Sequence, residues 1–449
     1  MSGSGGLLGH AVDDLLADEL HEIAGQRLTK RITDLRGDEG AGLPYEDERA
    51  LGIQVINEVL AEWRSAAYND GRMPLPTSLE EALAREVHNR LYGLGPLQNL
   101  IEDPDVVDIH VGGHANVWVH RADGSKEKGP PAAPDDATLI DMIARQARRI
   151  GRSERRWDRE EVALDLQLPD GSRLHALREV TGRPVIDIRC HNFVEFSRLS
   201  QMEDHDVMDR SISDFLRVAV RCGLNVIIGG GKGMGKTTNL RCLINEVPPE
   251  ERIITVEDSL ELGMERFPDL HPDVESIEAR PPNSEGHGEF TLSEAVRQGL
   301  RMRGRVIVGE VRGDEVIPML KAMSSGEEGS MCTIHAMSSA NVFDRLQMYA
   351  AMAEQGFDPD VTAMLVANAV HFVVYLAWDK GNPSRRRVQS VREVVGADNN
   401  QVISNEVWAP DPIGRAVPAA RLRQNTERIL SDAGYDLALR DNPNGWWRR

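Results

Sequence analysis

Apolar runs separated by helical segments dominate the second half of the chain, from about residue 211 to residue 410. Four of them are short, rich in β-branched residues and typical of buried strands: 225–228, 253–256, 306–308 and 331–334. Strands that alternate with helices predict a parallel sheet covered on both faces. Two further runs, 370–378 and 388–395, predict an antiparallel pair at the sheet edge. The pattern therefore predicts an α/β domain with a mostly parallel sheet over 211–410.

The preceding segment, 78–195, has a different order of elements. A helix at 79–92 is followed by strand-like runs, which are expected at 106–111, 116–120, 162–168, 173–178 and 184–189. The turn Pro-Asp-Gly-Ser between two of these runs is typical of a hairpin. Because helices and strands do not alternate here, the segment is predicted to be a smaller, separate α+β domain. Charged residues 196–210 are expected to link it to the α/β domain.

The two ends of the chain carry weaker patterns. Residues 1–77 predict a helical, partly disordered arm, with one amphipathic face from Leu8 to Ile23 and a second helix at about 47–66. Either this arm docks on another molecule or it forms a helical lid on the next domain. Beyond Pro410 the pattern fades into a weakly ordered tail, 411–449. Its Trp-Trp-Arg-Arg end is either a docking tag or a mobile terminus.

Composition narrows the class of protein. The formal charge of −20 argues against a general coat for nucleic acid, so no specific nucleic-acid partner is expected. Four cysteines without C-x-x-C spacing indicate neither disulfides nor a zinc site. The N-terminus lacks the pattern of a signal peptide, and the longest apolar stretch, 364–378, is too short for a membrane span. A cytoplasmic protein that reaches a membrane through partners or a surface contact is therefore expected.

A glycine-rich loop follows the first strand of the α/β domain. Gly230, Gly235, Lys236 and Thr237 fit G-x-x-x-x-G-K-[ST], between a predicted strand and a predicted helix. Such a loop cradles phosphates, with the lysine reaching the β- and γ-phosphates and the threonine hydroxyl binding Mg²⁺. A nucleotide and Mg²⁺ are therefore the expected ligands. The residues predicted to bind nucleotide are Gly230, Gly231, Lys232, Gly233, Met234, Gly235, Lys236, Thr237 and Thr238.

Ionisable residues stand where the next three strands end. Glu257 and Asp258 follow the second strand, Glu310 ends the third, and His335 ends the fourth. Ligands of open parallel sheets bind at the carboxyl ends of the strands. Glu310 is therefore the candidate for orienting or deprotonating the attacking water, and Glu257 for binding Mg²⁺-bound water or assisting. His335 either senses the γ-phosphate or makes a structural hydrogen bond.

Arginines flank the strand of Glu310. We expect one or two of them to reach phosphate or a neighbouring subunit, and the others to form salt bridges. They are Arg301, Arg303, Arg305 and Arg312.

Together these motifs resemble the type II/IV secretion ATPases, closest to the CpaF type that powers tight-adherence pilus assembly. The matching stretches are YGLGPLQNLIEDPDVVDIHV, LPDGSRLHA, NVIIGGGKGMGKTT, ITVEDSLEL, LRMRGRVIVGEVRGDE and GSMCTIHA. The resemblance implies a RecA-like ATPase domain, a homo-hexamer, and nucleotide bound between the two domains. It makes Glu257 and Asp258 an acidic box with a metal-binding role, Glu310 the Walker B glutamate and His335 the histidine box. Arg173 and Arg189 would come from the N-terminal domain towards the nucleotide, and Arg312 joins the catalytic candidates.

Some positions depart from the family pattern. Lys232 and Met234 replace small polar residues of the loop, and the segment after Arg189 lacks the usual basic pair followed by phenylalanine. None of these changes removes a core catalytic residue. The resemblance thus implies a hexameric, Mg²⁺-dependent ATPase that works with inner-membrane platform proteins of a pilus or secretion system. A conjugation or DNA-uptake ATPase is the main alternative, and a nucleic-acid motor or a nucleotide-gated scaffold agrees less well with the residues.

Overall fold

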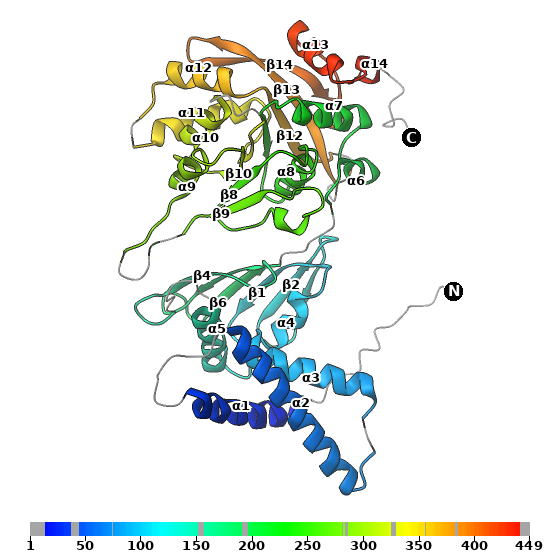
Figure 1. Ribbon diagram of the computed structural model, residues 1–449, viewed down its shortest axis with the longest axis vertical. Coiled ribbons are helices and arrows are strands. Elements are labelled where there is room, and N and C mark those ends of the chain that lie inside the picture. Colours follow the sequence, from blue (N-terminus) through cyan, green and yellow to red (C-terminus); the bar gives the residue numbers. More distant parts are fainter. Residues whose placement is uncertain are drawn as a thin grey trace, which may run out of the picture. The chain divides into compact units, whose positions relative to one another are not determined.

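The computed structural model describes residues 14–36, 45–73, 75–150, 157–190, 196–280, 282, 286–324, 329–354, 356–380, 382 and 385–440. The chain divides into two compact units, Met1–Asn192 and Phe193–Arg449 (Figure 1). The start of the predicted first amphipathic helix and the Trp-Trp-Arg-Arg end lie outside the described residues. Within the described ranges, no helix is both long and apolar enough to cross a membrane.

The first unit begins with three helices that share one apolar core. They are α1 (Asp14–Arg36), α2 (Tyr45–Asn69) and α3 (Thr77–Tyr92). Leu20, Val55 and Leu83 are buried in this core, one from each helix. Helix α2 approaches α3 closely at Gly52, where a Cβ would lie only 2.1 Å from the Tyr92 hydroxyl oxygen. The predicted N-terminal helices therefore form, and both pack on the helix that opens the α+β segment.

A six-stranded antiparallel sheet completes the first unit, in the order β3-β2-β1-β6-β5-β4. Its elements are α4 (Pro96–Ile101), β1 (Val106–Gly112), β2 (Val117–Arg121), β3 (Lys126–Lys128), α5 (Asp136–Ile150), β4 (Ala163–Gln167), β5 (Arg173–Leu177) and β6 (Val185–Arg189). Alternate strand residues such as Ile109, Leu174 and Ile186 pack with Leu139 and Ile143 of α5 in a second apolar core. The predicted strands and the β4–β5 hairpin are present, and the opposite face of the sheet carries polar side chains.

The second unit is built on a nine-stranded sheet in the order β15-β14-β13-β12-β7-β11-β10-β8-β9. Its strands are β7 (Val226–Gly230), β8 (Ile253–Glu257), β9 (Val274–Glu278), β10 (Arg305–Val311), β11 (Met331–His335), β12 (Phe372–Trp378), β13 (Arg386–Asp398), β14 (Gln401–Pro410) and β15 (Ala416–Pro418). The six strands from β12 to β9 are mutually parallel, and β13, β14 and β15 add antiparallel pairs. The α/β fold with a mostly parallel sheet is confirmed.

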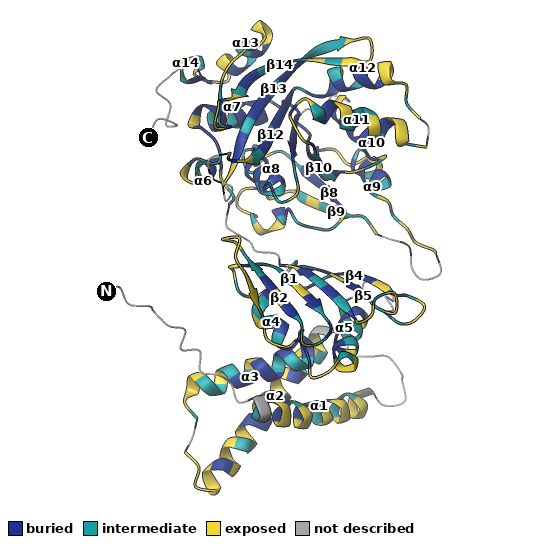
Figure 2. Ribbon diagram, turned by 180° about the vertical axis from the view of Figure 1, so that it is seen from behind, coloured by how far each residue is buried: buried dark blue, intermediate teal, exposed yellow. Residues whose placement is uncertain are grey.

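Helices cover both faces of this sheet, as continuous apolar strands require. The helices are α6 (Leu199–Asp204), α7 (Arg210–Arg221), α8 (Lys236–Ile244), α9 (Leu292–Gly299), α10 (Val316–Ser324), α11 (Asn341–Met352), α12 (Pro359–Ala369), α13 (Gln424–Asp432) and α14 (Leu437–Arg440). On one face the Phe215 ring of α7 lies 4.8 Å from that of Phe372 and 4.7 Å from that of Trp408. Figure 2 shows the central strands almost wholly buried between the two helical layers.

Three features of the second unit differ from the sequence expectation. Within 196–210, predicted as a linker, α6 buries Leu199 and Met202 in the core. Beyond Pro410, where weak order was expected, β15, α13 and α14 continue the fold as far as Arg440, with Leu430 and Tyr435 buried. Strand β12 pairs in parallel with β7, so only β13 and the strands after it form the antiparallel addition.

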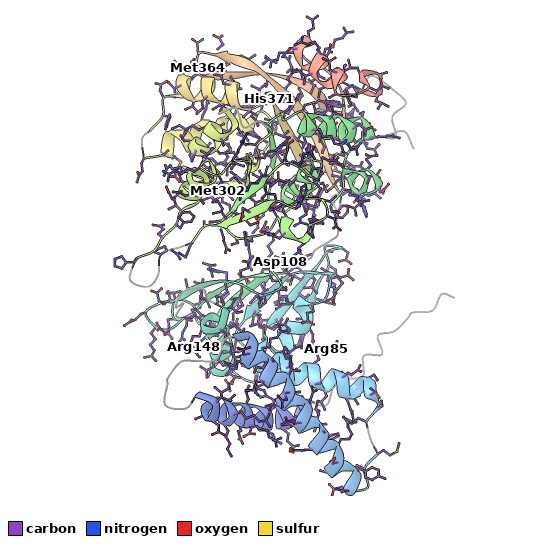
Figure 3. All side chains as sticks on the ribbon, in the orientation of Figure 1. Arg85, Asp108, Arg148, Met302, Met364 and His371 are labelled. Atoms are coloured by element: carbon purple, nitrogen blue, oxygen red, sulfur yellow. The ribbon has the colours of Figure 1, made fainter. Side chains whose placement is uncertain are left out.

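Asn225, just before β7, joins several loops and helices of this unit. Its side-chain amide donates to the carbonyl O atoms of Met323 and Ala369, each at 2.6 Å, and its Oδ1 accepts from the Gly329 N–H at 2.9 Å. The Asn225 N–H also donates at 3.0 Å to Nδ1 of His371, which is labelled in Figure 3. These bonds fix the start of the strand that leads into the glycine-rich loop.

Candidate nucleotide-hydrolysis site

Four parallel strands deliver the predicted polar residues to one edge of the sheet. Strands β7, β11, β10 and β8 are adjacent in that order, and their carboxyl ends share this edge. His335 is the register partner of Gly230, so the histidine lies beside the start of the glycine-rich loop. The rule that places functional side chains at the ends of parallel strands holds here.

The glycine-rich loop has the conformation of a phosphate cradle. Gly233 and Gly235 have φ of +76° and +80°, a region that side-chain-bearing residues avoid. Gly235 is the N-cap of α8, whose first residue is Lys236. The N–H groups at a helix start attract anions. Met234, the unusual residue of the loop, is buried in the core and anchors the loop, whereas Lys232 is exposed.

The Lys236 ammonium lies among acceptors from three elements. Its Nζ donates to the Gly231 carbonyl O at 3.2 Å, and it lies 3.4 Å from Oε1 of Glu310 and 3.3 Å from Nδ1 of His335. Burial lowers the pKa of the Lys236 ammonium, while the charge of Glu310 opposes that shift. The lysine is therefore held at the mouth of the loop by the two strand-end residues.

His335 bridges Lys236 and Glu310. Its Nε2 lies 2.9 Å from Oε1 of Glu310. Burial lowers the pKa of the His335 imidazole below its usual value. A neutral ring with the proton on Nε2 fits both contacts, because Nε2–H then donates to Glu310 and Nδ1 accepts from Lys236. These contacts connect the imidazole to both Lys236 and Glu310.

Glu310 is surrounded by cationic groups. Arg312 donates from Nε to Oε2 of Glu310 at 2.7 Å and from a terminal nitrogen to Oδ2 of Asp258 at 3.1 Å. Burial favours a higher pKa for Glu310, but Arg312 and Lys236 outweigh it and hold the pKa below its ordinary value. Glu310 is consequently an ionised acceptor, as a group that orients a water must be.

Sequence reasoning did not single out Glu315, which positions Arg312. The buried Glu315 carboxylate accepts the backbone N–H groups of Arg312 and Gly313, the second at 2.8 Å. Burial raises the pKa of Glu315. This carboxylate fixes the loop after β10 and with it the direction of the Arg312 side chain.

Glu257 occupies a different place from the one its predicted metal role implies. It is buried, and its Oε1 accepts the N–H groups of Glu261 at 2.9 Å and Leu262 at 3.0 Å. The ordered loop then presents Glu261, whose Oε2 accepts the Thr237 hydroxyl at 3.3 Å. Arg241 of α8 donates to the carbonyl O atoms of the same two loop residues, at 2.7 and 2.8 Å.

Thr237 and Glu261 form an oxygen donor set that fits Mg²⁺. Magnesium prefers oxygen ligands and commonly takes only one or two from the protein, with waters and phosphates completing the octahedron. Within the described ranges, no group of three or more His, Cys, Asp or Glu side chains is arranged to hold a metal ion by itself. The hydroxyl and the carboxylate beside a phosphate cradle are consistent with that pattern.

The predicted arginines fall into two groups. Arg173 and Arg189 belong to the first unit, where they are register partners on the neighbouring strands β5 and β6, and Arg189 is exposed. Arg305, in the second unit, is a buried structural residue. It pairs with Glu251 at 2.8 Å and donates to the Val220 carbonyl O at 2.6 Å. Arg301 and Arg303 precede the start of β10, at the opposite end of the strand from Glu310, whereas Arg312 directly follows the strand at the rim.

Comparison with known proteins places the whole arrangement in a family. The sequence profile of the family "Type II/IV secretion system protein" matches residues 90–378, more than half of the chain. A Mycobacterium tuberculosis protein named for conjugal transfer is 31% identical over 337 residues, which cover 73% of this chain and 91% of the relative. The type IV secretion system protein PtlH of Bordetella pertussis is 34% identical over 182 residues, covering 40% of this chain and 52% of PtlH.

Solved structures with a related fold include the Legionella pneumophila ATPase DotB. It matches with a TM-score of 0.46 at 18% identity, covering 66% of this chain and 79% of that one. The family profile spans the glycine-rich loop and the strand-end residues. The chain therefore belongs to the type II/IV secretion system protein family, the family of secretion ATPases that its motifs predicted.

Proposed function

We propose that this protein is a Mg²⁺-dependent motor that hydrolyses ATP to ADP and phosphate to drive assembly of a pilus or secretion apparatus. The observation that carries the proposal is the contact cluster of Lys236, Glu310 and His335 at the mouth of the phosphate cradle. A cation for the phosphates, an ionised carboxylate for water and a neutral imidazole meet there within hydrogen-bond distance. Hydrolysis of a nucleoside triphosphate needs these parts and little covalent chemistry.

The proposed role of each residue follows from its charge. Lys236 and the N–H groups at the start of α8 bind the β- and γ-phosphates. Thr237 and Glu261 would hold Mg²⁺, which would supply positive charge for those phosphates, and Glu257 keeps the Glu261 loop in place. Asp258 instead holds Arg312. Glu310 accepts a hydrogen bond from the attacking water and orients it, while Arg312 stabilises charge that develops on the γ-phosphate.

Turnover of the purified full chain tests this proposal. Phosphate release from ATP is expected with Mg²⁺ and not with excess chelator. Lys236→Ala should lose both nucleotide binding and turnover, whereas Lys321→Ala, which changes an exposed lysine of α10 outside the site, should retain both. A wild-type protein that releases no phosphate under any tested Mg²⁺ concentration would contradict the proposal.

Assembly into a homo-hexamer is part of the same proposal. Arg173 and Arg189 are then proposed to contribute positive charge to a nucleotide bound between the two domains, so that hydrolysis moves one domain against the other. Their position on adjacent strands supports a joint role. If they act between subunits, ATPase activity per subunit should rise with protein concentration as oligomers form. A flat specific activity across the dissociation range, measured alongside mass, would exclude shared sites.

The machine served by this motor is proposed to be a tight-adherence pilus at the inner face of the plasma membrane, reached through platform proteins. The CpaF-like motif set supports that assignment. A conjugation ATPase is the second candidate, and the 31% identity to a relative named for conjugal transfer favours it. Disruption of the gene in its own host separates the two. Loss of surface filaments supports the first, and loss of DNA transfer with filaments intact supports the second.

A further inference from the structure

An exposed tryptophan and arginine stand on the far side of the phosphate cradle from Glu310. Strand β12 runs parallel to β7, and Leu376 is the register partner of Gly230. Trp378 ends β12 two residues later, at the same edge of the sheet as the strand-end residues described above. It pairs with Arg386, the first residue of β13. The mechanism proposed above uses neither residue.

Both residues lie close to the glycine-rich loop. A Cβ on Gly230 would lie 2.9 Å from the Leu376 carbonyl O, and a Cβ on Gly235 would lie 3.8 Å from Cδ of Arg386. Arg386 is therefore beside the start of α8. Its guanidinium carbon lies 5.3 Å from the centroid of the Trp378 ring, within the range of a cation–π contact.

The next residues fix the base of this hairpin. Arg387 pairs with Asp379, and both side chains are almost completely buried. Arg385 donates to Asp206 at 2.8 Å, which ties the hairpin to the segment after α6. Trp378 and Arg386 thus extend from an anchored base, and Trp378 is 42% exposed.

The order of the strands indicates on which side of β7 the nucleoside of a bound nucleotide lies. Glu310 and His335 stand on β10 and β11, on one side of the P-loop strand β7, and β12 stands on the other. If the γ-phosphate meets Lys236, Glu310 and His335, the nucleoside leaves the cradle away from them. The side that remains is the edge formed by β12 and β13, where Trp378 and Arg386 lie.

We propose that Trp378 and Arg386 form a nucleoside shelf, on which the base of the bound nucleotide stacks. The proposal rests on the proposed function, because it requires the phosphates to lie in the cradle. An indole and a guanidinium in contact offer planar, polarisable surfaces, and nucleobases stack on aromatic rings and on arginine planes. Because any base can stack in this way, the shelf is expected to increase the affinity for nucleotides without distinguishing between bases.

Binding of ADP and of pyrophosphate to the full chain tests the shelf, because these ligands share two phosphates and differ by the nucleoside. Trp378→Ala should weaken ADP binding roughly 5-fold or more while leaving pyrophosphate binding unchanged. Trp378→Phe should keep most of the ADP affinity. Arg386→Ala should weaken ADP more than pyrophosphate. Trp118→Ala, which removes a comparably exposed tryptophan from the first unit, is the control and should change neither.

The outcomes separate the two proposals. Unchanged ADP affinity in folded Trp378→Ala and Arg386→Ala proteins would contradict the nucleoside shelf. It would not affect the proposed phosphate cradle. Equal weakening of ADP and pyrophosphate would also overturn it, since the residues would then act on the phosphates or on the loop. A wild-type chain that binds neither ligand would overturn the proposed function, and the shelf with it.

Discussion

Substitution of Glu310 by glutamine removes one negative charge from the rim and changes almost nothing in shape. In the structure that carboxylate lies 3.4 Å from Nζ of Lys236, and both side chains are largely buried. At an effective dielectric constant of about 20, two unit charges at this distance attract by roughly 5 kcal/mol before the cost of desolvation. The ion pair with Arg312 adds less electrostatic attraction than its short distance suggests, because the Arg312 side chain is half exposed and screened by water.

Glu310→Gln should therefore separate binding from hydrolysis. Lys236 loses its anionic partner and remains available to phosphate, so ATP affinity is expected to stay the same or to rise. Loss of the group that orients water should lower the turnover number by about 10²–10³-fold. Phosphate release and equilibrium binding of ATP, both measured with Mg²⁺, check the two expectations.

Glu275→Gln is the matched control for this experiment. It makes the same chemical change on β9 of the same sheet, where Glu275 pairs with Arg252 at 3.2 Å. Its turnover should equal that of the wild type. Turnover by Glu310→Gln within a few-fold of the wild type would refute the assignment, and so would loss of ATP binding by a folded Glu310→Gln protein.

Three further results are expected. Glu261→Gln should raise the Mg²⁺ concentration needed for half-maximal turnover by about 10- to 100-fold, as removal of a metal-orienting carboxylate does. An unchanged Mg²⁺ requirement would contradict the proposed role of Glu261 in holding the metal. The native pKa of His335 is lowered from the unfolded value of 6.5, so the unfolded chain takes up this proton first as pH falls. Below pH 6.5 the free energy of unfolding should therefore fall less steeply with decreasing pH in His335→Gln than in the wild type. Equal slopes would count against the neutral, partly buried ring. Trp408→Ala should lower the free energy of unfolding of the second unit by about 3–5 kcal/mol, seen in denaturant melts, because the ring is fully buried against Phe215.

Much of the site was predictable because it follows from two local rules. Glycines in a G-x-x-x-x-G-K-[ST] loop specify a backbone that cradles phosphate, and the structure has that loop between β7 and α8. Parallel strands end at one edge, so Glu310 and His335, which are far apart in sequence, meet at Lys236. The α/β fold followed from the same buried strands.

The features that were not predicted depend on tertiary contacts, which the periodicity of hydrophobic residues does not reveal. Glu261 lies in a turn after β8, and it reaches Thr237 only because the buried Glu257 carboxylate accepts two N–H groups of that turn. An acidic residue four positions after Glu257 was the available signal. Strand β9 has a polar sequence, Val-Glu-Ser-Ile-Glu, without an apolar run, because it lies at the sheet edge.

The C-terminal elements were missed for a related reason. Residues 416–440 are short segments separated by polar turns, and their order comes from packing rather than from local propensity. Tyr435, for example, is buried against Phe215, with ring centroids 5.8 Å apart and its hydroxyl donating to the Ser211 carbonyl O at 3.2 Å. Helix α7, more than two hundred residues earlier in the chain, supplies that partner.

A structure determined with Mg²⁺ and a non-hydrolysable ATP analogue tests the central claim most directly. The account predicts that the β- and γ-phosphates lie on the N–H groups of the loop from Gly231 to Lys236, with Mg²⁺ on the Thr237 hydroxyl. It also predicts that Nζ of Lys236 moves from Glu310 to the γ-phosphate, while Glu310 faces the water opposite the bond to be broken. Nucleotide bound elsewhere, or bound at the loop with the Lys236–Glu310 pair intact at 3.4 Å, would contradict it.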